Sequence, residues 1–406
     1  MDINSIQRVD VRRRCVDARD IIKLDTNTFP RRVIFIITGL ATGGAETMLF
    51  KLCSRLDRRR FVPSVVSLSD KGVIGPRIEA LGIPVYTLGM RPNRLSLAGL
   101  LRLRKLVSTL RPNLIQGWMY HGNLAASLAA GSKPVVWGIR QSLYGLDKER
   151  VLTRWVIRLG AVVSRYSRAI VYNSHTSARQ HEAFGFDASR SRTIPNGFDT
   201  EVFHPDESAR AGIRQELELS DNAILIGLVG RHHPMKDHWN FLNAAALLGK
   251  ESPDVYFLLA GREVDAGNSI LTAMIMEFGL GERVFLLGER KDIPQLNAAL
   301  DIASSASAWG EGFANVIGEA MSCGVPCVVT DVGDSAWIVG DTGRVVPPRA
   351  PETLAVAWKS LIALGRNGRQ ALGMRARLRV IENFSLGAVV KHYEELYESV
   401  IARAEV

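Results

Sequence analysis

The feature of the sequence that most restricts its fold is a series of short apolar runs that begins twice along the chain. The first run, at 33–37, is β-branched and aromatic without alternation, which is typical of a strand buried on both faces of a parallel sheet. Helical patterns separate the runs, which lie at 33–37, 62–68, 83–87, 114–118, 135–138 and 169–172, and then at 224–229, 255–259, 284–287, 301–303 and 327–329. Strands alternating with helices predict doubly wound parallel sheets, and the restart predicts two of them.

The turn-rich segment Ile-Pro-Asn-Gly-Phe-Asp at 194–199 marks the expected boundary between the two sheets. A chain of 406 residues exceeds what one hydrophobic core usually supports. We expect a basic extension at 1–30, Rossmann-like domains at 31–200 and 201–385, and a helix at 386–406 that packs back toward the first domain. Because such sheets bind ligands at the carboxyl ends of their strands, the site should lie in a cleft between the domains.

Basic residues are concentrated in the first half of the chain. Residues 1–200 contain 32 Lys and Arg against 14 Asp and Glu, a net charge of +18, and the remainder contains 19 against 27, a net of −8, which together give +10. The asymmetry predicts an anionic partner, and a solvated basic face is the alternative. Two amphipathic basic stretches favour a membrane surface over nucleic acid, for which no known module or aromatic interleaving is present. These stretches are 91–111, with Arg94, Arg102, Arg104 and Lys105, and 150–168, around Trp155.

Targeting and redox features favour the cytoplasm, with the chain peripheral at the inner face of the membrane. The N-terminus lacks the apolar stretch of a secretory signal. The stretch without charges between Arg111 and Lys133 contains polar residues that are costly in a bilayer. Of four cysteines, Cys323 and Cys327 flank a Gly-Val-Pro turn and are expected to be buried, and no spacing fits zinc.

A glycine-bearing loop at 38–46 follows the first predicted strand and precedes a helical pattern. Backbone N–H groups at Gly43 and Gly44 could approach an anion at the helix start. The spacing matches neither the dinucleotide fingerprint nor a Walker loop, so a purely structural turn is equally compatible.

Two cations, Arg231 and Lys236, follow the first strand of the second series on a loop broken by Pro234. Cations beyond the carboxyl end of a strand can contact two phosphate groups, Arg through its fork and Lys as a point charge. An exposed pair without a ligand is the alternative.

The segment 309–321, Trp-Gly-Glu-Gly-Phe-Ala-Asn-Val-Ile-Gly-Glu-Ala-Met, is predicted to run from a loop into a helix that ends before Gly324. Glu311 would lie on the loop and Glu319 in the helix. The helix start between them offers N–H groups to a phosphate, and both carboxylates suit sugar or ribose hydroxyls. Surface acids on an amphipathic helix are the alternative.

Taken in order, the glycine pair, the two cations and the Glu-x7-Glu segment resemble the family 4 retaining glycosyltransferases of group 1, over about residues 32–400. The resemblance implies a GT-B fold, in which two Rossmann-like domains, 31–200 for the acceptor and 201–385 for the nucleotide sugar, face a central cleft. The cations would hold the donor diphosphate, Glu311 the sugar hydroxyls and Glu319 the ribose. The implied donor-binding residues are Gly43, Gly44, Arg231, Lys236, Glu311, Phe313, Ala314, Asn315, Val316 and Glu319, and the implied catalytic residues are His121, Arg231, Lys236 and Glu311.

The resemblance places His121 beside the donor sugar near the reacting carbon, whereas the residue alone suggests a capping or core histidine. Arg140 is expected to face the acceptor or, equally, to form a structural ion pair. Two departures from the family pattern are the histidines at 232 and 233, whose roles stay open, and Ala314, which stands where Pro or Gly is common. No Asp-x-Asp occurs in the chain, so no metal or other cofactor is expected.

These features predict a metal-independent, retaining hexosyltransferase. It would move a sugar from a nucleotide-diphosphate sugar, such as a UDP-sugar, to a lipid-linked or saccharide acceptor in cell-surface polysaccharide or glycolipid synthesis. A nucleotide-sugar epimerase or phosphorylase of the same fold and a non-catalytic nucleotide-sugar binder are the alternatives.

Overall fold

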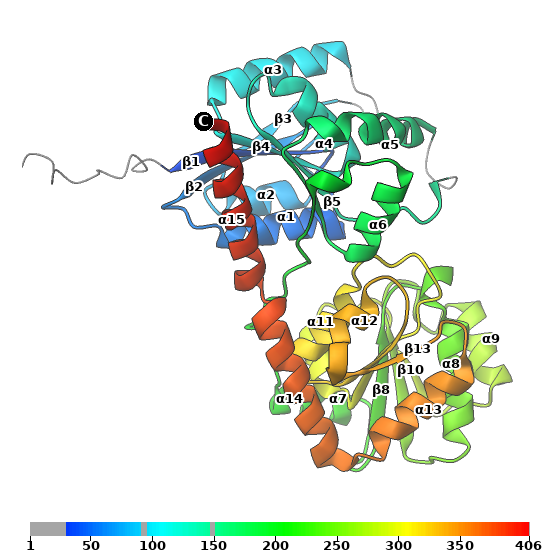
Figure 1. The fold of residues 1–406 in the computed structure, drawn as a ribbon. Coiled ribbons are helices and arrows are strands. Elements are labelled where there is room, and N and C mark those ends of the chain that lie inside the picture. The colour runs from blue at the N-terminus through cyan, green and yellow to red at the C-terminus, as the bar shows by residue number, and fades with distance from the viewer. Residues whose placement is uncertain (1–29, 91–95, 147–150, 406) are drawn as a thin grey trace, which may run out of the picture.

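The computed structural model describes residues 30–90, 96–146 and 151–405, and these residues form two parallel α/β units joined by two crossings of the chain (Figure 1). The doubly wound pair of sheets predicted from the apolar runs is confirmed. The extension predicted at 1–30 lies, except for Pro30, outside the described residues, and so does Arg94.

The first sheet has the strand order β3-β2-β1-β4-β5-β6-β7, with every pairing parallel. Its strands are β1 (Arg31–Ile37), β2 (Phe61–Ser67), β3 (Val85–Thr87), β4 (Leu114–Trp118), β5 (Val135–Ile139), β6 (Ala169–Tyr172) and β7 (Ser191–Thr193). The edge strand β7 was not predicted, because its sequence, Ser-Arg-Thr, contains no apolar run.

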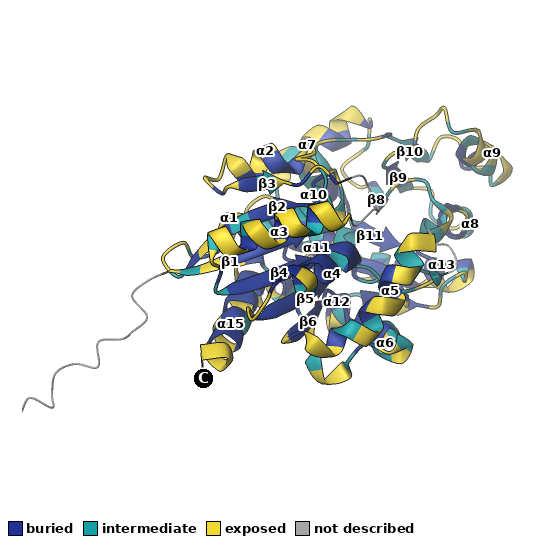
Figure 2. Cartoon of the chain, turned by 90° about the horizontal axis from the view of Figure 1, so that it is seen from above, coloured by how far each residue is buried: buried dark blue, intermediate teal, exposed yellow. Residues whose placement is uncertain are grey.

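Helices cover both faces of the first sheet. They are α1 (Gly44–Arg55), α2 (Ile74–Glu79), α3 (Leu97–Leu110), α4 (Met119–Ala129), α5 (Val151–Val163) and α6 (His175–Phe184), with short 3-10 turns η2 (Ser164–Tyr166) and η3 (Ala188–Arg190). Alternate residues of β1 point to opposite faces, so that Phe35 packs with α1 and Ile36 packs with α3 to α5. Viewed from above, the strands are buried while α3 and α5 carry exposed outer stripes (Figure 2).

The second sheet has the order β10-β9-β8-β11-β12-β13. Its strands are β8 (Ile224–Val229), β9 (Val255–Ala260), β10 (Val284–Leu286), β11 (Ile302–Ser305), β12 (Cys327–Thr330) and β13 (Arg344–Val346). Its helices are α7 (Glu207–Glu216), α8 (His238–Gly249), α9 (Ser269–Glu277), α10 (Ile293–Ala299), α11 (Asn315–Ser322), α12 (Ser335–Val339), α13 (Pro351–Ile362) and α14 (Gly365–Asn383), with turns η4 (Pro234–Lys236) and η5 (Gly340–Thr342). The short edge strand β13 was also not predicted.

The two crossings between the units are hydrogen-bonded to each other. The Phe198 N–H donates to Phe384 O at 2.9 Å, and the Leu386 N–H donates to Phe198 O at 2.8 Å. After this point α15 (Leu386–Glu405) packs in the core of the first unit, where Tyr393 and Tyr397 are fully buried (Figure 1). The last helix thus ties the end of the chain to the unit in which the chain began.

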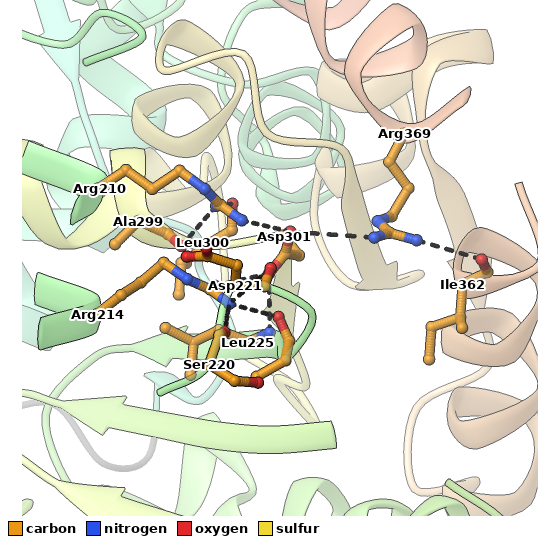
Figure 3. Close-up of polar contacts among 11 residues, drawn as sticks. Arg210, Arg214, Ser220, Asp221, Leu225, Ala299, Leu300, Asp301, Ile362 and Arg369 are labelled. Carbon is orange, nitrogen blue, oxygen red and sulfur yellow. Dashed lines mark hydrogen bonds and ion pairs between the residues drawn. The ribbon is translucent and has the colours of Figure 1, made fainter. Parts of the chain in front are cut away.

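At the amino end of the second sheet, Asp301, whose side chain is 9% exposed, anchors two helices (Figure 3). Asp301 accepts hydrogen bonds from Arg210 of α7 at 2.8 Å, from Arg214 at 3.3 Å and from the Leu225 N–H at 2.9 Å. Arg369 of α14 lies 4.0 Å from the same carboxylate. This cluster fixes α7 and α14 at the edge of the sheet opposite the carboxyl ends of its strands.

Candidate active site

A cavity of 590 Å³ lies between the two units, bounded by loops that follow strands in both. From the first unit, the lining includes the start of α1, Met119 and the segment 140–146; from the second, it includes the loop 309–313. Of the candidate residues, the cavity is lined by Gly44, Arg140, Glu311, Phe313 and Asn315. The location agrees with the rule that doubly wound sheets bind ligands at their carboxyl edges.

The glycine loop ends where α1 begins, with Gly43 as the N-cap in an extended conformation and Gly44 as the first helical residue. A Cβ at Gly43 would lie 2.3 Å from Oε2 of Glu46, so the glycine allows that carboxylate to fold back over the loop. Glu46 also lines the cavity, and burial raises the pKa of its carboxyl. The start of α1 is therefore accessible to a ligand in the cavity, and the carboxyl of Glu46 lies beside it.

Lys236 and Glu311 meet across the loops that follow β8 and β11. The Lys236 ammonium lies 2.5 Å from Oε1 of Glu311, and Ser307 Oγ donates to the same oxygen at 2.9 Å. The loops are also joined by the Ala308 N–H, which donates to the carbonyl of Met235 at 2.8 Å. The Lys236 ammonium and the Ser307 hydroxyl therefore orient the Glu311 carboxylate, whose oxygens can accept hydrogen bonds from hydroxyl groups.

Arg231 lies exposed at the start of the same loop. It does not line the cavity among the described residues, but it follows directly on Gly230, past the carboxyl end of β8. An exposed guanidinium on a strand-end loop can reach a phosphate that enters the cleft.

The helix start predicted at 313–316 is observed, since α11 begins at Asn315 with Ala314 as its N-cap. Phe313 and Ala314 are buried in the core of the second unit, and Val316 packs against the same core. Asn315 reaches across the cleft, where its Oδ1 accepts a hydrogen bond from Asn196 at 2.6 Å. The helix ends before Gly324, which has the predicted left-handed conformation with φ of +73°.

Glu319 lies on the second turn of α11 and is half-buried. Burial raises the pKa of its carboxyl, and the charges of Lys51 and Lys236 lower it. Lys51 belongs to the first unit and Lys236 to the second, so cations from both sides of the cleft act on the Glu319 carboxylate.

His121 is buried on α4, behind the cavity rather than in its lining. Its Nε2 has no hydrogen-bond partner among the described residues, and burial lowers the pKa of the ring, so the imidazole is neutral at pH 7. A Cβ at the neighbouring Gly122 would lie 2.4 Å from Ile36 O, so glycine allows α4 to approach β1 closely. Met119, which does line the cavity, has a φ of +65°, a strained conformation of the kind found at functional sites.

Arg140 lines the cavity, and two of its guanidinium nitrogens already donate hydrogen bonds within the protein. One donates to the hydroxyl of Tyr393 on α15 at 2.7 Å and another to Oδ1 of Asn196. The guanidinium also lies 5.1 Å from the ring centroid of Trp118. These partners are neutral, so they are not the carboxylate that a structural ion pair would require.

Sequence reasoning missed several residues of the cleft. Glu46 lies two residues after the Gly43-Gly44 pair, and this spacing was the signal available for it. Tyr144 and Trp309, from opposite units, stack with ring centroids 5.2 Å apart. Ser142 Oγ donates to Gly310 O at 2.9 Å. These contacts join loops about 165 residues apart, so no pattern among neighbouring residues in the sequence predicts them.

Cysteine burial follows the sequence prediction. Cys323 and Cys327 are buried and free, and burial raises the pKa of each thiol to about 12. Within residues 30–90, 96–146 and 151–405, no group of three or more His, Cys, Asp or Glu side chains could hold a metal ion.

Two family models match the chain, one on each unit. The model described as Glycosyltransferase Family 4 matches residues 42–202, and the model described as Glycosyl transferases group 1 matches residues 223–363.

Curated relatives are glycosyltransferases of bacterial glycoconjugates. The UDP-Gal:alpha-D-GlcNAc-diphosphoundecaprenol alpha-1,3-galactosyltransferase of Escherichia coli is 32% identical over 38% of this chain and 40% of its own length. The D-inositol 3-phosphate glycosyltransferase of Salinispora tropica is 28% identical over 68% of this chain and 57% of its own length. The chain thus matches less than two thirds of either relative.

Among solved structures, Anabaena HepE in complex with UDP has a TM-score of 0.79 and 25% identity, covering 91% of this chain and 100% of HepE. HepE in complex with UDP-glucose gives a TM-score of 0.74 at 25% identity. Because the two family models divide between the units and the likeness to HepE spans both, this chain belongs to the family 4, group 1 glycosyltransferases and has the GT-B fold.

Proposed function

We propose that this chain is a retaining glycosyltransferase that uses a UDP-sugar as donor. The observation that carries the proposal is the Lys236–Glu311 pair, whose Glu311, on the loop before α11, lines the same cavity as Gly44 at the start of α1. The names of relatives support the donor class, since the Escherichia coli enzyme uses UDP-Gal and HepE binds UDP and UDP-glucose.

In the proposed reaction, the bond between C1 of the sugar and the diphosphate oxygen breaks, and that oxygen keeps the electron pair. The acceptor oxygen bonds to C1 on the same face, and its proton passes to the departing phosphate. Arg231, Lys236 and the N–H groups at the start of α11 would stabilise the charge that develops on the diphosphate. A well-placed donor of this kind typically contributes about 3–4 kcal/mol.

Glu311, held by Lys236 and Ser307, would accept hydrogen bonds from hydroxyls of the donor sugar, and Glu319 from the ribose. The neutral imidazole of His121 would form a hydrogen bond with the donor sugar when the donor lies beside α4. It would do so through Nε2, which has no partner among the described residues. The phosphate charge would be balanced by side chains and a helix dipole, so we further propose that transfer needs no metal ion. Arg140 and the loop at 141–146 would face the acceptor.

A lipid-linked acceptor is supported by the outer surface of the first unit. Helices α3 and α5 contain no acidic residue, and both flank α4. Leu97 on α3 is 75% exposed, and Trp155 on α5 is 62% exposed. Basic side chains accompany these apolar ones, with Arg158 placed over the Trp155 ring. No helix among the described residues has the length and apolarity to cross a bilayer. We therefore propose that this face rests on an anionic membrane at the cytoplasmic side.

Incubation with a panel of nucleotide sugars, first without an acceptor and then with undecaprenyl-diphosphate sugars, tests the function. We expect slow release of UDP without acceptor and retention of the anomeric configuration in the product. Conversion of the donor to an epimer would favour the epimerase, donor formation from sugar phosphate would favour the phosphorylase, and UDP binding without any turnover would favour a non-catalytic binder.

A further inference from the structure

The loop between β12 and α12 carries a buried carboxylate, Asp334, whose contacts reach both units. Its backbone N–H donates to Gly312 O at 3.0 Å, on the loop that carries Glu311. Its carboxylate accepts three hydrogen bonds from the other unit: from the His175 N–H at 2.6 Å, the Thr176 N–H at 2.9 Å and Thr176 Oγ1 at 2.7 Å. The residue is 4% exposed. One aspartate thus joins the donor loop to the start of α6.

The start of α6 is well suited to hold this carboxylate. The first N–H groups of a helix have no partner within the helix, and the helix dipole favours a negative charge there. Ser174 caps α6 by accepting from the Ser177 N–H at 3.0 Å, which leaves the N–H groups of His175 and Thr176 for Asp334. Charge-assisted bonds of this kind are stronger than neutral ones, so the contact favours the closed arrangement of the two units.

Glycine at 333 lets the aspartate reach the donor loop. Gly333 has a φ of +64°, and a Cβ there would lie 2.4 Å from Glu311 O and 2.8 Å from Gly312 O. On the next turn, the Trp337 ring packs edge-on against His175, with centroids 4.6 Å apart. The turn therefore touches the backbone of the donor loop and α6 at the same time.

We propose that Asp334 is a positioning residue that holds the two units closed and couples their closure to the placement of Glu311. When the units separate, the carboxylate loses its three donors, and the turn that supports the backbone at 311–312 loses its contact with α6. The inference rests on the proposed function only in its second part, the placement of Glu311, since the contacts between Asp334 and α6 are made by residues of the chain itself.

The first test uses the full chain without ligand and needs no donor. In Asp334→Ala, we expect the amides of His175 and Thr176 to exchange hydrogen at least about tenfold faster, and the radius of gyration from small-angle scattering to rise. The matched control is Asp206→Ala, which removes a capping aspartate that accepts from the Ala209 N–H at 2.9 Å inside the second unit. Unchanged exchange and an unchanged radius in Asp334→Ala would overturn the proposal.

The second test measures UDP binding by calorimetry and UDP release from UDP-glucose. We expect Asp334→Ala to lower turnover about tenfold while the UDP dissociation constant changes by less than about twofold, because the proposed diphosphate contacts lie within the second unit. Asp334→Asn should recover part of the loss, since its amide oxygen still accepts from Thr176. Equal losses of turnover, UDP affinity and thermal stability would mark Asp334 as merely structural. If the wild-type chain neither binds UDP nor turns over UDP-glucose, the proposed function fails while the exchange test still decides the closure.

Discussion

The two walls of the cleft are built differently. On the second unit, the candidate residues are already bonded to each other: Lys236 is paired with Glu311, and Ser307 supports the same carboxylate. On the first unit, Nε2 of His121 has no hydrogen-bond partner within the part of the chain that the structure describes, and the outer helices of that unit expose large apolar side chains. The contrast supports the proposal that the wall formed by the second unit, called the donor wall below, is preorganised for the nucleotide sugar.

The largest expected effect comes from breaking the donor wall. Lys236→Ala should lower sugar transfer by about 100- to 1,000-fold, because it removes a cation proposed to stabilise the leaving diphosphate. Steady-state kinetics with the best donor of the panel measure this, with circular dichroism to confirm the fold. Lys250→Ala, at an exposed lysine after α8, is the control and should keep full activity. A fully active Lys236→Ala enzyme would contradict the role given to this residue.

A second comparison concerns one buried histidine in each unit. His181 of α6 donates through Nδ1 to Ser177 O at 2.7 Å, and its Nε2 lies 2.8 Å from the Tyr120 hydroxyl. His238 of α8 has no hydrogen-bond partner on either ring nitrogen among the described residues. We expect His181→Leu to destabilise the chain by about 1–3 kcal/mol, because Tyr120 loses its acceptor, and His238→Leu to cost less. Thermal unfolding measures the stability of both variants. Equal losses of stability would contradict the expected difference between His181 and His238.

The same histidines predict how stability depends on pH. Burial lowers the pKa of both His181 and His238 to about 4, from an ordinary value of 6.5. The unfolded chain therefore binds protons first as the pH falls, so stability from these groups is complete above pH 6.5 and is lost progressively toward pH 4. Thermal unfolding between pH 7.5 and 4.5 tests this, and in His181→Leu the slope should be shallower. If stability fell with pH as steeply in His181→Leu as in the wild-type chain, groups other than His181 would be responsible for the acid sensitivity.

A smaller effect is expected at the outer face of the first unit. Trp155→Asp should weaken binding to vesicles that contain phosphatidylglycerol by about tenfold. It replaces an exposed apolar anchor with a negative charge, which the anionic lipid repels. Co-sedimentation at low and high salt measures this. Trp239→Asp is the control, since Trp239 is 47% exposed on the second unit. Equal losses in both variants, or binding that salt does not affect, would count against this surface.

The smallest expected effect is that of metal removal. Excess chelator should leave transfer within about twofold of its untreated rate, because the proposal balances the diphosphate with Arg231, Lys236 and the dipole of α11. Activity assays with and without chelator measure this directly. A loss that Mg²⁺ restores would require a metal beside the diphosphate.

The sequence by itself determined the two sheets and most of the motifs that line the cleft. A strand that is buried on both faces of a parallel sheet appears in the sequence as a continuous apolar run. The glycine, cation and Glu-x7-Glu motifs can each be found from neighbouring residues, and so can their order along the chain. The edge strands β7, Ser-Arg-Thr, and β13, Arg-Val-Val, were not predicted, because neither lies in an apolar run of more than two residues, whereas the equally short edge strands β3 and β10 lie in longer runs. Polar edge strands are identified only by the neighbour to which they bond.

Only the tertiary structure decided which side chains meet. The pairing of Lys236 with Glu311, the bonds from Arg140 to Tyr393, and the contact of Asp334 with α6 join residues that are far apart in the chain. The Lys236–Glu311 pair depends on how β8 and β11 lie in the second sheet, the bond from Arg140 to Tyr393 on the return of α15 to the first unit, and the contact of Asp334 with α6 on the position of the second unit against the first. Apolar patterns in the sequence indicate how far each residue is buried, but the identity of a long-range partner is fixed only when the sheets and helices pack together.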